Sequence, residues 1–405
     1  MSTRSIIHLD LDTFFVSCER RLDSRLNDKP ILIGGTSSRG VVASCSYEAR
    51  AFGIHSAMPM KLARQLCPHA VVIRGNSAIY SKFSDEVTDI IAEGAPLYEK
   101  SSIDEFYIDM TGMERFFGSF RWAQELRTRI IRETGLPISF GMSTSKTVAK
   151  VSTNEAKPNN FMQVEGGREK PFLAPLVVNK IPMVGEETYR MLLNLGVKWV
   201  RTVQEMPIEL MERVMGKHGI ELWKKAQGID NSPVIPFYER KSISLERTFE
   251  RDTTDIRKLR NMIIAMAENL AYQLRQGNKL TSCVAVKIRY SDFQTQMKQL
   301  RIPYTSCDHI IIRRVLELFC KLYDRRVLLR LIGVRLSHLV EGGHQINMFD
   351  DTQETIHLYY AMDKIRNRYG QDAVKRAVGL DSPGIGHIGN PFDGRPPVIP
   401  AHRRA

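Results

Sequence analysis

Apolar and polar positions alternate along the first strand that the sequence predicts, Ile6–Asp12. Because successive side chains of a strand point to opposite faces, Asp10 and Asp12 lie on one face and Leu9 and Leu11 on the other. Burying an isolated aspartate in such an apolar run is strongly unfavourable unless a cation lies beside it. We therefore expect a cation next to this strand.

A second pattern of β-favouring residues surrounds the adjacent carboxylates Asp104 and Glu105, with strand-like segments at Leu97–Lys100 and Phe106–Asp109. An isolated Asp-Glu pair is most often a solvated turn. In a regular strand the two side chains would point to opposite faces, so they can serve one site only at a bend or a hairpin tip. If this hairpin lies beside the first strand, Asp10 joins them and the three carboxylates suit a divalent-metal site.

Strands and helices continue to alternate around these carboxylates up to about residue 165, which predicts an α/β domain. The predicted strands are Pro30–Gly35, Val41–Ser44 and Ile138–Met142. The predicted helices are Cys18–Leu26, Tyr47–Phe52, one that starts near Ala78, Arg121–Thr134 and Lys146–Asn154.

The segment 240–341 is strongly basic, with 20 Lys and Arg against 10 Asp and Glu, and carries most of the formal net charge of +13. It predicts strands at Cys283–Tyr290, Gln296–Pro303 and Leu331–Leu339 and helices at Ile256–Gln276 and Ile310–Arg325. In the first of these strands Lys287 and Arg289 alternate with Val286 and Ile288, so one face is apolar and the other basic. Such a face suits a phosphate backbone, and the alternative for any single residue is a solvated charge.

Length and composition indicate a globular protein of about two to four domains, because 405 residues exceed a single core. No stretch approaches the roughly 20 apolar residues of a membrane span, and the start of the chain lacks a signal-peptide pattern, so we expect a cytosolic protein. The six cysteines have no CxxC spacing, and we expect reduced thiols with neither zinc nor disulfides. The positive charge favours a polyanionic partner, although a generic basic protein is compatible with charge alone.

Four blocks of sequence resemble, in order and spacing, the Y-family (translesion) DNA polymerases, closest to the DNA polymerase IV and kappa branch. The blocks are HLDLDTFFVSCE at 8–19, GVVASCSYEARAFGIHSAMP at 40–59, SSIDEFYID at 101–109 and FGMSTSKTVAKVSTNEAKPNN at 140–160. Weaker similarity continues to about residue 380. Four ordered blocks are more specific than any single motif.

The resemblance implies a multidomain α/β (α+β) protein with the right-hand arrangement of a polymerase. The implied parts are a palm at 1–10 and 78–165, small fingers at 11–77, a helical thumb at 166–235, a linker at 236–241 and an α/β little finger at 242–341. Residues 342–380 would hold a clamp-binding peptide and a helical tail, and 381–405 would be disordered.

The resemblance also implies the chemistry of the site. Asp10, Asp104 and Glu105, together with the backbone carbonyl of Leu11, would hold two Mg²⁺ ions for template-directed phosphoryl transfer to a primer. We find no further acidic motifs of a proofreading exonuclease in the sequence. Low fidelity and low processivity would follow.

Positions that match the family's nucleotide contacts are Tyr47, Arg50 and Lys157, to which the resemblance adds Phe14 and Ser44. Tyr47 and Arg50 lie three residues apart and so share a helix face, where a phenol and a guanidinium can hold a triphosphate.

The bulky Phe15 would stack under the deoxyribose and exclude ribonucleotides, whereas the alternative is a core aromatic. The small residues Val41 and Ala43 would roof the nascent base pair and leave room for damaged template bases.

Three further regions resemble family contacts with macromolecules. The segment Val178–Val197 resembles a helix-hairpin-helix whose turn, including Gly185, binds a DNA phosphate, although Met183 stands where the family usually has glycine. An ordinary helical connector is the alternative there. Little-finger contacts with DNA are implied for Lys287, Arg289 and Arg335.

In the tail, Gln345, Met348 and Phe349 resemble the peptides with which bacterial polymerases dock into a pocket of the sliding clamp. The implied partners are therefore primer–template DNA, deoxynucleoside triphosphates and the clamp, for a chain that is monomeric and has no membrane partner. Two alternatives stay open: a nucleotide cyclase, which needs no basic DNA grip, and a non-catalytic, clamp-recruited DNA-binding protein, for which clustered carboxylates would be unfavourable.

Overall fold

The computed structural model describes residues 4–37, 39–113, 118–325, 327–342, 353–370 and 373–379. The chain divides into two compact units, one that extends to Tyr238 and one that begins at Glu239. The division falls within residues 236–241, the stretch proposed as a linker. Among the described residues, no helix combines the length and the apolar character that a membrane crossing requires.

The first unit is built on a five-stranded mixed sheet with the order β5-β6-β1-β7-β8. Its strands are β1 (Ile6–Leu11), β5 (Tyr98–Lys100), β6 (Glu105–Asp109), β7 (Ile138–Ser143) and β8 (Phe161–Gln163). All six residues of the central strand β1 are buried. Because its side chains alternate between the two faces of the sheet, both faces must be covered.

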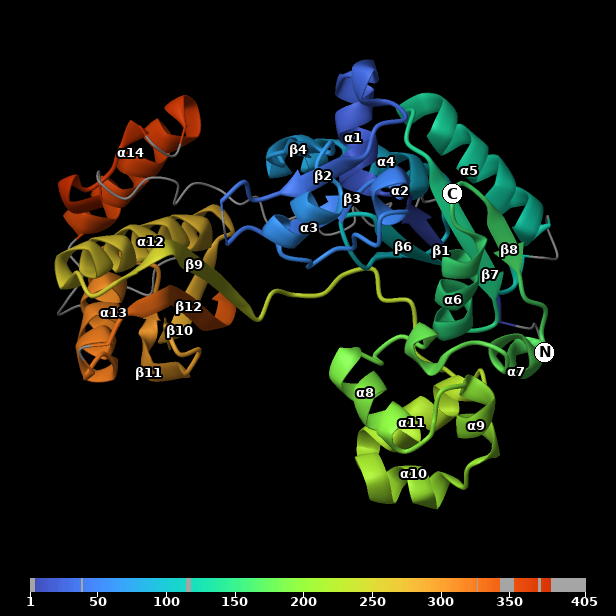
Figure 1. The fold of residues 1–405 in the computed structure, drawn as a ribbon. Coiled ribbons are helices and arrows are strands. Elements are labelled where there is room, and N and C mark those ends of the chain that lie inside the picture. Colours follow the sequence, from blue (N-terminus) through green and yellow to red (C-terminus); the bar gives the residue numbers. More distant parts are fainter. Residues whose placement is uncertain are drawn as a thin grey trace. The chain divides into compact units, whose positions relative to one another are not determined.

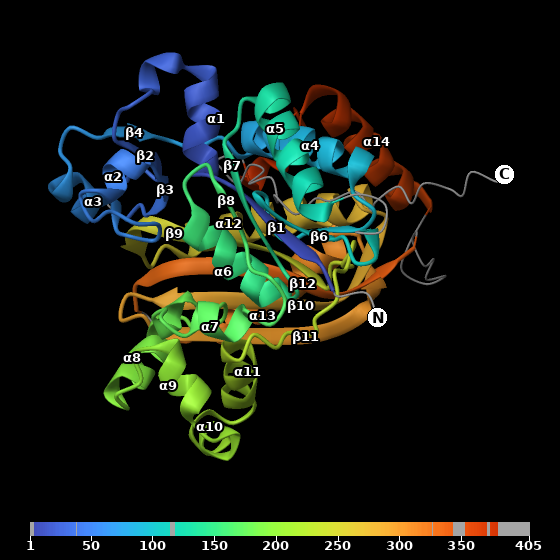
Figure 2. The ribbon, with the colours of Figure 1, turned by 90° about the vertical axis from the view of Figure 1, so that its right-hand side faces the viewer.

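Helices cover the two faces of this sheet differently (Figure 2). Helices α4 (Ser77–Gly94) and α5 (Ser119–Thr134) lie side by side and share one apolar core with Ile7, Leu9 and Leu11 of β1. Helix α6 (Lys146–Ala156) packs on the opposite face, against β1 and β7. The polar positions of β1 therefore face α6.

Two smaller assemblies complete this unit (Figure 1). The first is a three-stranded sheet of β2 (Ile31–Gly34), β3 (Val42–Cys45) and β4 (Val71–Ile73), with the helical elements α1 (Phe14–Leu22), η1 (Ser24–Leu26), α2 (Tyr47–Arg50) and α3 (Met60–Leu66). The second is a helical cluster of α7 (Glu169–Leu173), η3 (Val178–Lys180), α8 (Glu186–Asn194), α9 (Val200–Glu205), α10 (Ile208–Met215) and α11 (Lys217–Ala226).

The second unit is a four-stranded antiparallel sheet with the order β11-β10-β12-β9 and helices on one face. Its elements are β9 (Ser242–Thr253), α12 (Ile256–Gln276), β10 (Lys279–Tyr290), β11 (Thr295–Thr305), α13 (Asp308–Leu322), β12 (Leu329–Glu341), α14 (Gln353–Tyr369) and η5 (Ala377–Gly379). Buried ion pairs, Arg275 with Asp363 and Arg366 with Glu268, connect α14 to α12.

Among the predicted helices, two differ most from the structure. The helix predicted at Cys18–Leu26 begins at Phe14 and ends at Leu22, because Thr13 turns the chain in the left-handed region and Asp23 adopts an extended conformation that starts a separate 3-10 turn. The first helix predicted around Val178 is a single 3-10 turn. All six cysteines are free thiols.

Candidate active site

The three predicted carboxylates come together where β1, β6 and the turn before β6 meet. In the antiparallel pairing of β1 with β6, Asp10 lies directly opposite Glu105. Asp104 precedes β6 in the turn, where its backbone carbonyl accepts a hydrogen bond from the amide of Leu11 at 3.0 Å. This turn is the bend that two adjacent acids require to serve one site.

Burial dominates the electrostatics of these acids. It raises the pKa of the Asp10 carboxyl to about 7, with Lys157 opposing the rise and Glu105 and Asp104 adding to it. Burial also raises the pKa of Asp104, opposed by a hydrogen bond from the Ser102 hydroxyl at 2.5 Å. Buried, mutually repelling carboxylates gain from a cation that neutralises them.

Lysines from α6 and from its C-terminal end lie beside these acids. Lys157 Nζ lies 2.5 Å from Asp10 Oδ1, and Lys150 Nζ donates to both oxygens of Glu105 at 2.7 and 2.6 Å. In the described part of the chain, no group of three or more His, Cys, Asp or Glu side chains is arranged to hold a metal ion. The donor set of two aspartates and a glutamate suits Mg²⁺ in its chemistry, but two of its members are engaged by ammonium groups.

Lys150 is absent from the predicted site residues, although the sequence contains a signal for it. Lys146 and Lys150 are four residues apart in α6 and therefore share one helix face. That face is the one packed toward β1, where Lys146 Nζ pairs with Glu99 at 2.7 Å. The spacing places a second lysine near the sheet but does not reveal which acid it contacts.

Asp12, the other acid of the predicted β1 pattern, has a structural role. Its carboxylate accepts hydrogen bonds from the Asn159 amide at 2.7 Å, the Ser139 hydroxyl at 2.8 Å and the Tyr47 hydroxyl at 3.4 Å. It thereby fixes the loop that follows Lys157 and one end of α2. The sequence contains no local sign of this network, because its partners are distant in the chain.

The predicted nucleotide contacts lie on neighbouring elements of the first unit. The hydroxyl of Ser46 caps α2 by accepting from the Ala49 amide at 3.3 Å, and the Arg50 guanidinium lies 4.9 Å from the centre of the Tyr47 ring. Ser44 is largely buried on β3.

The two adjacent phenylalanines have different environments. Phe15 is partly buried and stacks on Tyr80, whereas Phe14 is only 2% exposed in the core. The side chain of Phe14 is thus a packing residue, and only its backbone is left for a nucleotide contact.

The predicted roof residues lie at the start of β3. Val41 and Ala43 are exposed, whereas Val42 and Ser44 between and after them are buried. The alternation follows from the strand geometry and leaves one face of small apolar side chains open.

Met183 adopts a backbone conformation that favours glycine, with φ = 82°. The hairpin runs from η3 to α8, and Gly185 precedes the first residue of α8. Met183 is 63% exposed, and Lys225 Nζ lies 3.0 Å from its sulfur. The concern that methionine is strained at this position therefore holds.

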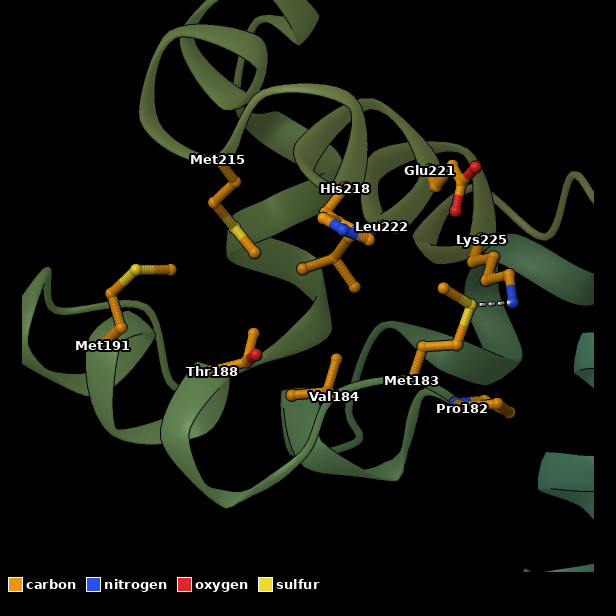
Figure 3. A pocket seen from close by; sticks show the side chains of 10 residues that line it. All are labelled: Pro182, Met183, Val184, Thr188, Met191, Met215, His218, Glu221, Leu222 and Lys225. Atoms are coloured by element: carbon orange, nitrogen blue, oxygen red, sulfur yellow. Dashed lines mark hydrogen bonds between the residues drawn. The ribbon is translucent and has the colours of Figure 1, made fainter. Parts of the chain in front are cut away.

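A cavity of about 350 Å³ lies behind this hairpin (Figure 3). Side chains of the hairpin and α8, among them Val184 and Thr188, point toward Met215, His218 and Leu222 of the facing helices. Val184 also packs against the apolar core of this helical cluster, so the hairpin is anchored beside the cavity.

The basic residues predicted in the second unit share one face of its sheet. Lys287 and Arg289 alternate with buried Val286 and Ile288 on β10, and Ala285 pairs with Arg335 of β12. Helices α12 and α13 bury the opposite face. Lys287 also pairs with Glu246 at 2.9 Å. The residues Gln345, Met348 and Phe349 lie outside the described residues.

Comparisons with known proteins agree over most of the chain. The model of the impB/mucB/samB family matches residues 9–154, and that of the impB/mucB/samB family C-terminal domain matches residues 240–348. The chain is 37% identical to the DNA polymerase IV of Dehalococcoides mccartyi (strain ATCC BAA-2100) over 379 residues, which cover 93% of this chain and 97% of the relative. It is 35% identical to the DNA polymerase IV of Clostridioides difficile (strain 630) over 367 residues, 90% of this chain and 99% of the relative.

A solved structure is also similar. A chimeric Y-family DNA polymerase superposes with a TM-score of 0.72 at 25% identity, and the match covers 84% of this chain and 100% of that chain.

Proposed function

The chain belongs to the impB/mucB/samB family, the Y-family of translesion DNA polymerases, and on this premise we propose that it extends a primer by two-metal phosphoryl transfer at Asp10, Asp104 and Glu105. The observation that carries the proposal is the position of Asp10 opposite Glu105, with Asp104 in the preceding turn. These acids come from segments about 95 residues apart, so their convergence follows from the fold.

In this mechanism the three carboxylates and the carbonyl of Leu11 would hold two Mg²⁺ ions. Bound there, the ions would supply activation of the primer 3′-hydroxyl and neutralisation of the triphosphate and the leaving pyrophosphate. The raised pKa values of Asp10 and Asp104 describe carboxylates that gain from neutralisation by a cation.

Tyr47, Arg50 and Lys157 orient the triphosphate. The guanidinium of Arg50 is exposed beside the Tyr47 ring, and its planar fork suits two phosphate oxygens. Lys157 follows α6 and lies beside Asp10, so one lysine can contact both a metal-binding acid and a phosphate. The backbone of Phe14 and the residue Ser44 complete the pocket, and Phe15 closes it against the sugar.

Synthesis past damaged template bases follows from the exposed, small side chains of Val41 and Ala43 over the nascent pair. A small roof imposes little steric selection on the template base. Low fidelity is the expected consequence.

Duplex DNA is held by the basic sheet face with Lys287, Arg289 and Arg335, and by backbone amides near Gly185 in the thumb. The sliding clamp is the further partner, through Gln345, Met348 and Phe349, and compensates for weak retention on DNA by raising the effective concentration. The polymerase acts as a monomer.

Primer extension on a template with a damaged base, with Mg²⁺ and all four deoxynucleotides, tests this function. Wild-type protein should extend the primer, and Asp104→Ala should not. Asp85→Ala, which removes an exposed acid on α4, is the matched control and should extend normally. Tight DNA binding without extension by the wild type would instead favour a non-catalytic, clamp-recruited protein.

A further inference from the structure

We propose that Lys150 is a positioning residue that competes with the divalent metal for Glu105, so that metal binding at this carboxylate transfers the Lys150 ammonium to a phosphate group of the substrate. The inference rests on the proposed function, because only a polymerase substrate brings both a metal and phosphates to this site. Metal loading and substrate binding would then be coupled through one side chain.

The ion pair between Lys150 and Glu105 is close and partly buried. The ammonium donates to both carboxylate oxygens, at 2.7 and 2.6 Å, and the two side chains are 25% and 20% exposed. A divalent ion takes the same oxygen lone pairs as ligands and repels the ammonium. The lysine and the metal therefore compete for this carboxylate.

The helix that carries Lys150 is firmly seated, so the release of Glu105 is a movement of the side chain. On the neighbouring turn, the Thr153 hydroxyl bonds to the carbonyls of His8 and Ala149 at 3.0 and 2.8 Å. Helix α6 approaches β7 so closely that a Cβ on Gly141 would lie 2.4 Å from the Ala149 carbonyl oxygen. Only the flexible lysine stem can respond to a metal.

Lys146 differs from Lys150 in its acceptors. It lies one turn earlier on the same helix face, but its ammonium pairs with Glu99 at 2.7 Å and also donates to the carbonyl of Pro233. Neither acceptor belongs to the proposed metal site. Lys146 therefore provides a charge-matched control on the same helix.

Once displaced, the Lys150 ammonium needs an anionic partner, because a partly buried cation without one is unfavourable. Phosphates are the anions that both substrates supply. The phosphate can belong to the primer–template backbone or to the nucleotide, and binding measurements separate these two sources.

The test is a Mn²⁺ titration of the full chain, followed by the electron paramagnetic resonance signal of the free ion. Lys150→Met should bind Mn²⁺ about two- to fivefold more tightly than the wild type without substrate, because the competing ion pair is gone. Lys150→Arg keeps a competing cation, so its Mn²⁺ affinity should stay near that of the wild type. The Mn²⁺ affinity of Lys146→Met should also stay near that of the wild type. Equal Mn²⁺ affinity for Lys150→Met and the wild type, or an equal gain for Lys146→Met, would overturn the proposal.

The coupling is measured by repeating the titration with primer–template DNA alone and with a deoxynucleoside triphosphate alone. The substrate that receives the ammonium should raise the Mn²⁺ affinity of the wild type more than that of Lys150→Met. If neither substrate does so, the transfer to phosphate is wrong. Primer extension by the wild type is measured in parallel. If the wild type extends the primer but Lys150→Met has the Mn²⁺ affinity of the wild type, only the role of Lys150 is rejected. If the wild type does not extend the primer, the proposed function is rejected as well.

Discussion

The ring of Phe15 stacks on the ring of Tyr80, with centroids 4.5 Å apart and planes 17° from parallel. The hydroxyl of Tyr80 donates to Glu19 at 2.6 Å, which fixes the tyrosine from the far side. Phe15 is thus held in one orientation by its aromatic neighbour. A residue that discriminates between sugars must be rigid in this way, since a mobile ring would yield to a 2′-hydroxyl.

Phe15→Ala should raise the incorporation of ribonucleotides relative to deoxynucleotides by about tenfold or more, because a steric block of this size is removed. Tyr80→Leu should cause a smaller rise, since Phe15 remains but loses its stacking partner. The measurement is single-nucleotide incorporation with each sugar. Unchanged discrimination in Phe15→Ala would assign the ring to the core only.

Met183→Gly should stabilise the hairpin before α8 locally by about 0.5–1 kcal/mol. The left-handed backbone costs methionine about 1–2 kcal/mol, and the greater unfolded-chain entropy of glycine offsets part of this difference. Met183→Ala is the matched control, since it also removes the side chain but keeps the Cβ. Native-state hydrogen exchange of the amides in α8 reports the local stability. Equal protection in the two variants would show that φ at this position carries no cost.

The sequence predicts those elements best whose pattern is regular along the chain. Helix α12 has the predicted limits, Ile256–Gln276, and strand β1 differs by one residue. The helix near Cys18 was misplaced because its start depends on the left-handed Thr13, a conformation with no signal in the side-chain pattern. Strand β9 was not predicted, because most of its sequence is polar and its pairing with β12 depends on the fold.

In the candidate site, too, features with a local sequence pattern could be predicted and features that depend on tertiary packing could not. The carboxylates of Asp10 and Glu105 are visible in short patterns, and their convergence follows from one antiparallel strand pair. The engagement of Glu105 by Lys150 could not be predicted, because it depends on how α6 lies across the sheet. The sequence thus identifies the chemistry of the acids better than their partners.

The basic sheet face should contribute to DNA affinity through phosphates. Arg289→Gln should weaken DNA binding and lower the slope of log affinity against log salt by about 0.9, the loss of one phosphate contact. Glu246→Gln should strengthen binding, since it frees Lys287 from its ion pair. Fluorescence anisotropy at several salt concentrations measures both effects. The control is Lys258→Gln on α12, which lies on the other side of the sheet; the same slope change there would mean that net charge alone is responsible.

The tail peptide should carry most of the affinity for a sliding clamp. Met348→Ala and Phe349→Ala should each weaken clamp binding about tenfold, because each removes an apolar anchor from a pocket. Asn347→Ala, between the two anchors, should have little effect. Surface plasmon resonance with immobilised clamp gives the three affinities, and undiminished binding by the first two variants would remove the peptide from the interface.

His8 is fully buried on β1 and should make the protein less stable in mild acid. Its Nδ1 lies 2.9 Å from the Thr153 hydroxyl, and its Nε2 has no hydrogen-bond partner among the described residues. Burial, followed by the charges of Lys150, Lys157 and Lys146, holds the pKa of His8 well below 6.5. Below about pH 6.5 the His8 side chain therefore binds a proton in the unfolded chain but not in the folded chain. As a result, the free energy of unfolding falls as the pH falls.

His8→Leu should remove this loss, which has a limiting slope of about 1.4 kcal/mol per pH unit. The quantity to compare is the free energy of unfolding in urea of the variant minus that of the wild type, measured from pH 7 to pH 5. This difference is needed because Asp10, with its raised pKa, makes both proteins more stable as the pH falls. The free energy of unfolding of the variant should rise relative to that of the wild type as the pH falls. His55→Leu replaces an exposed histidine and serves as the control. Parallel curves for His8→Leu and the wild type would mean that His8 is protonated within the fold, with its charge accommodated next to the active-site lysines.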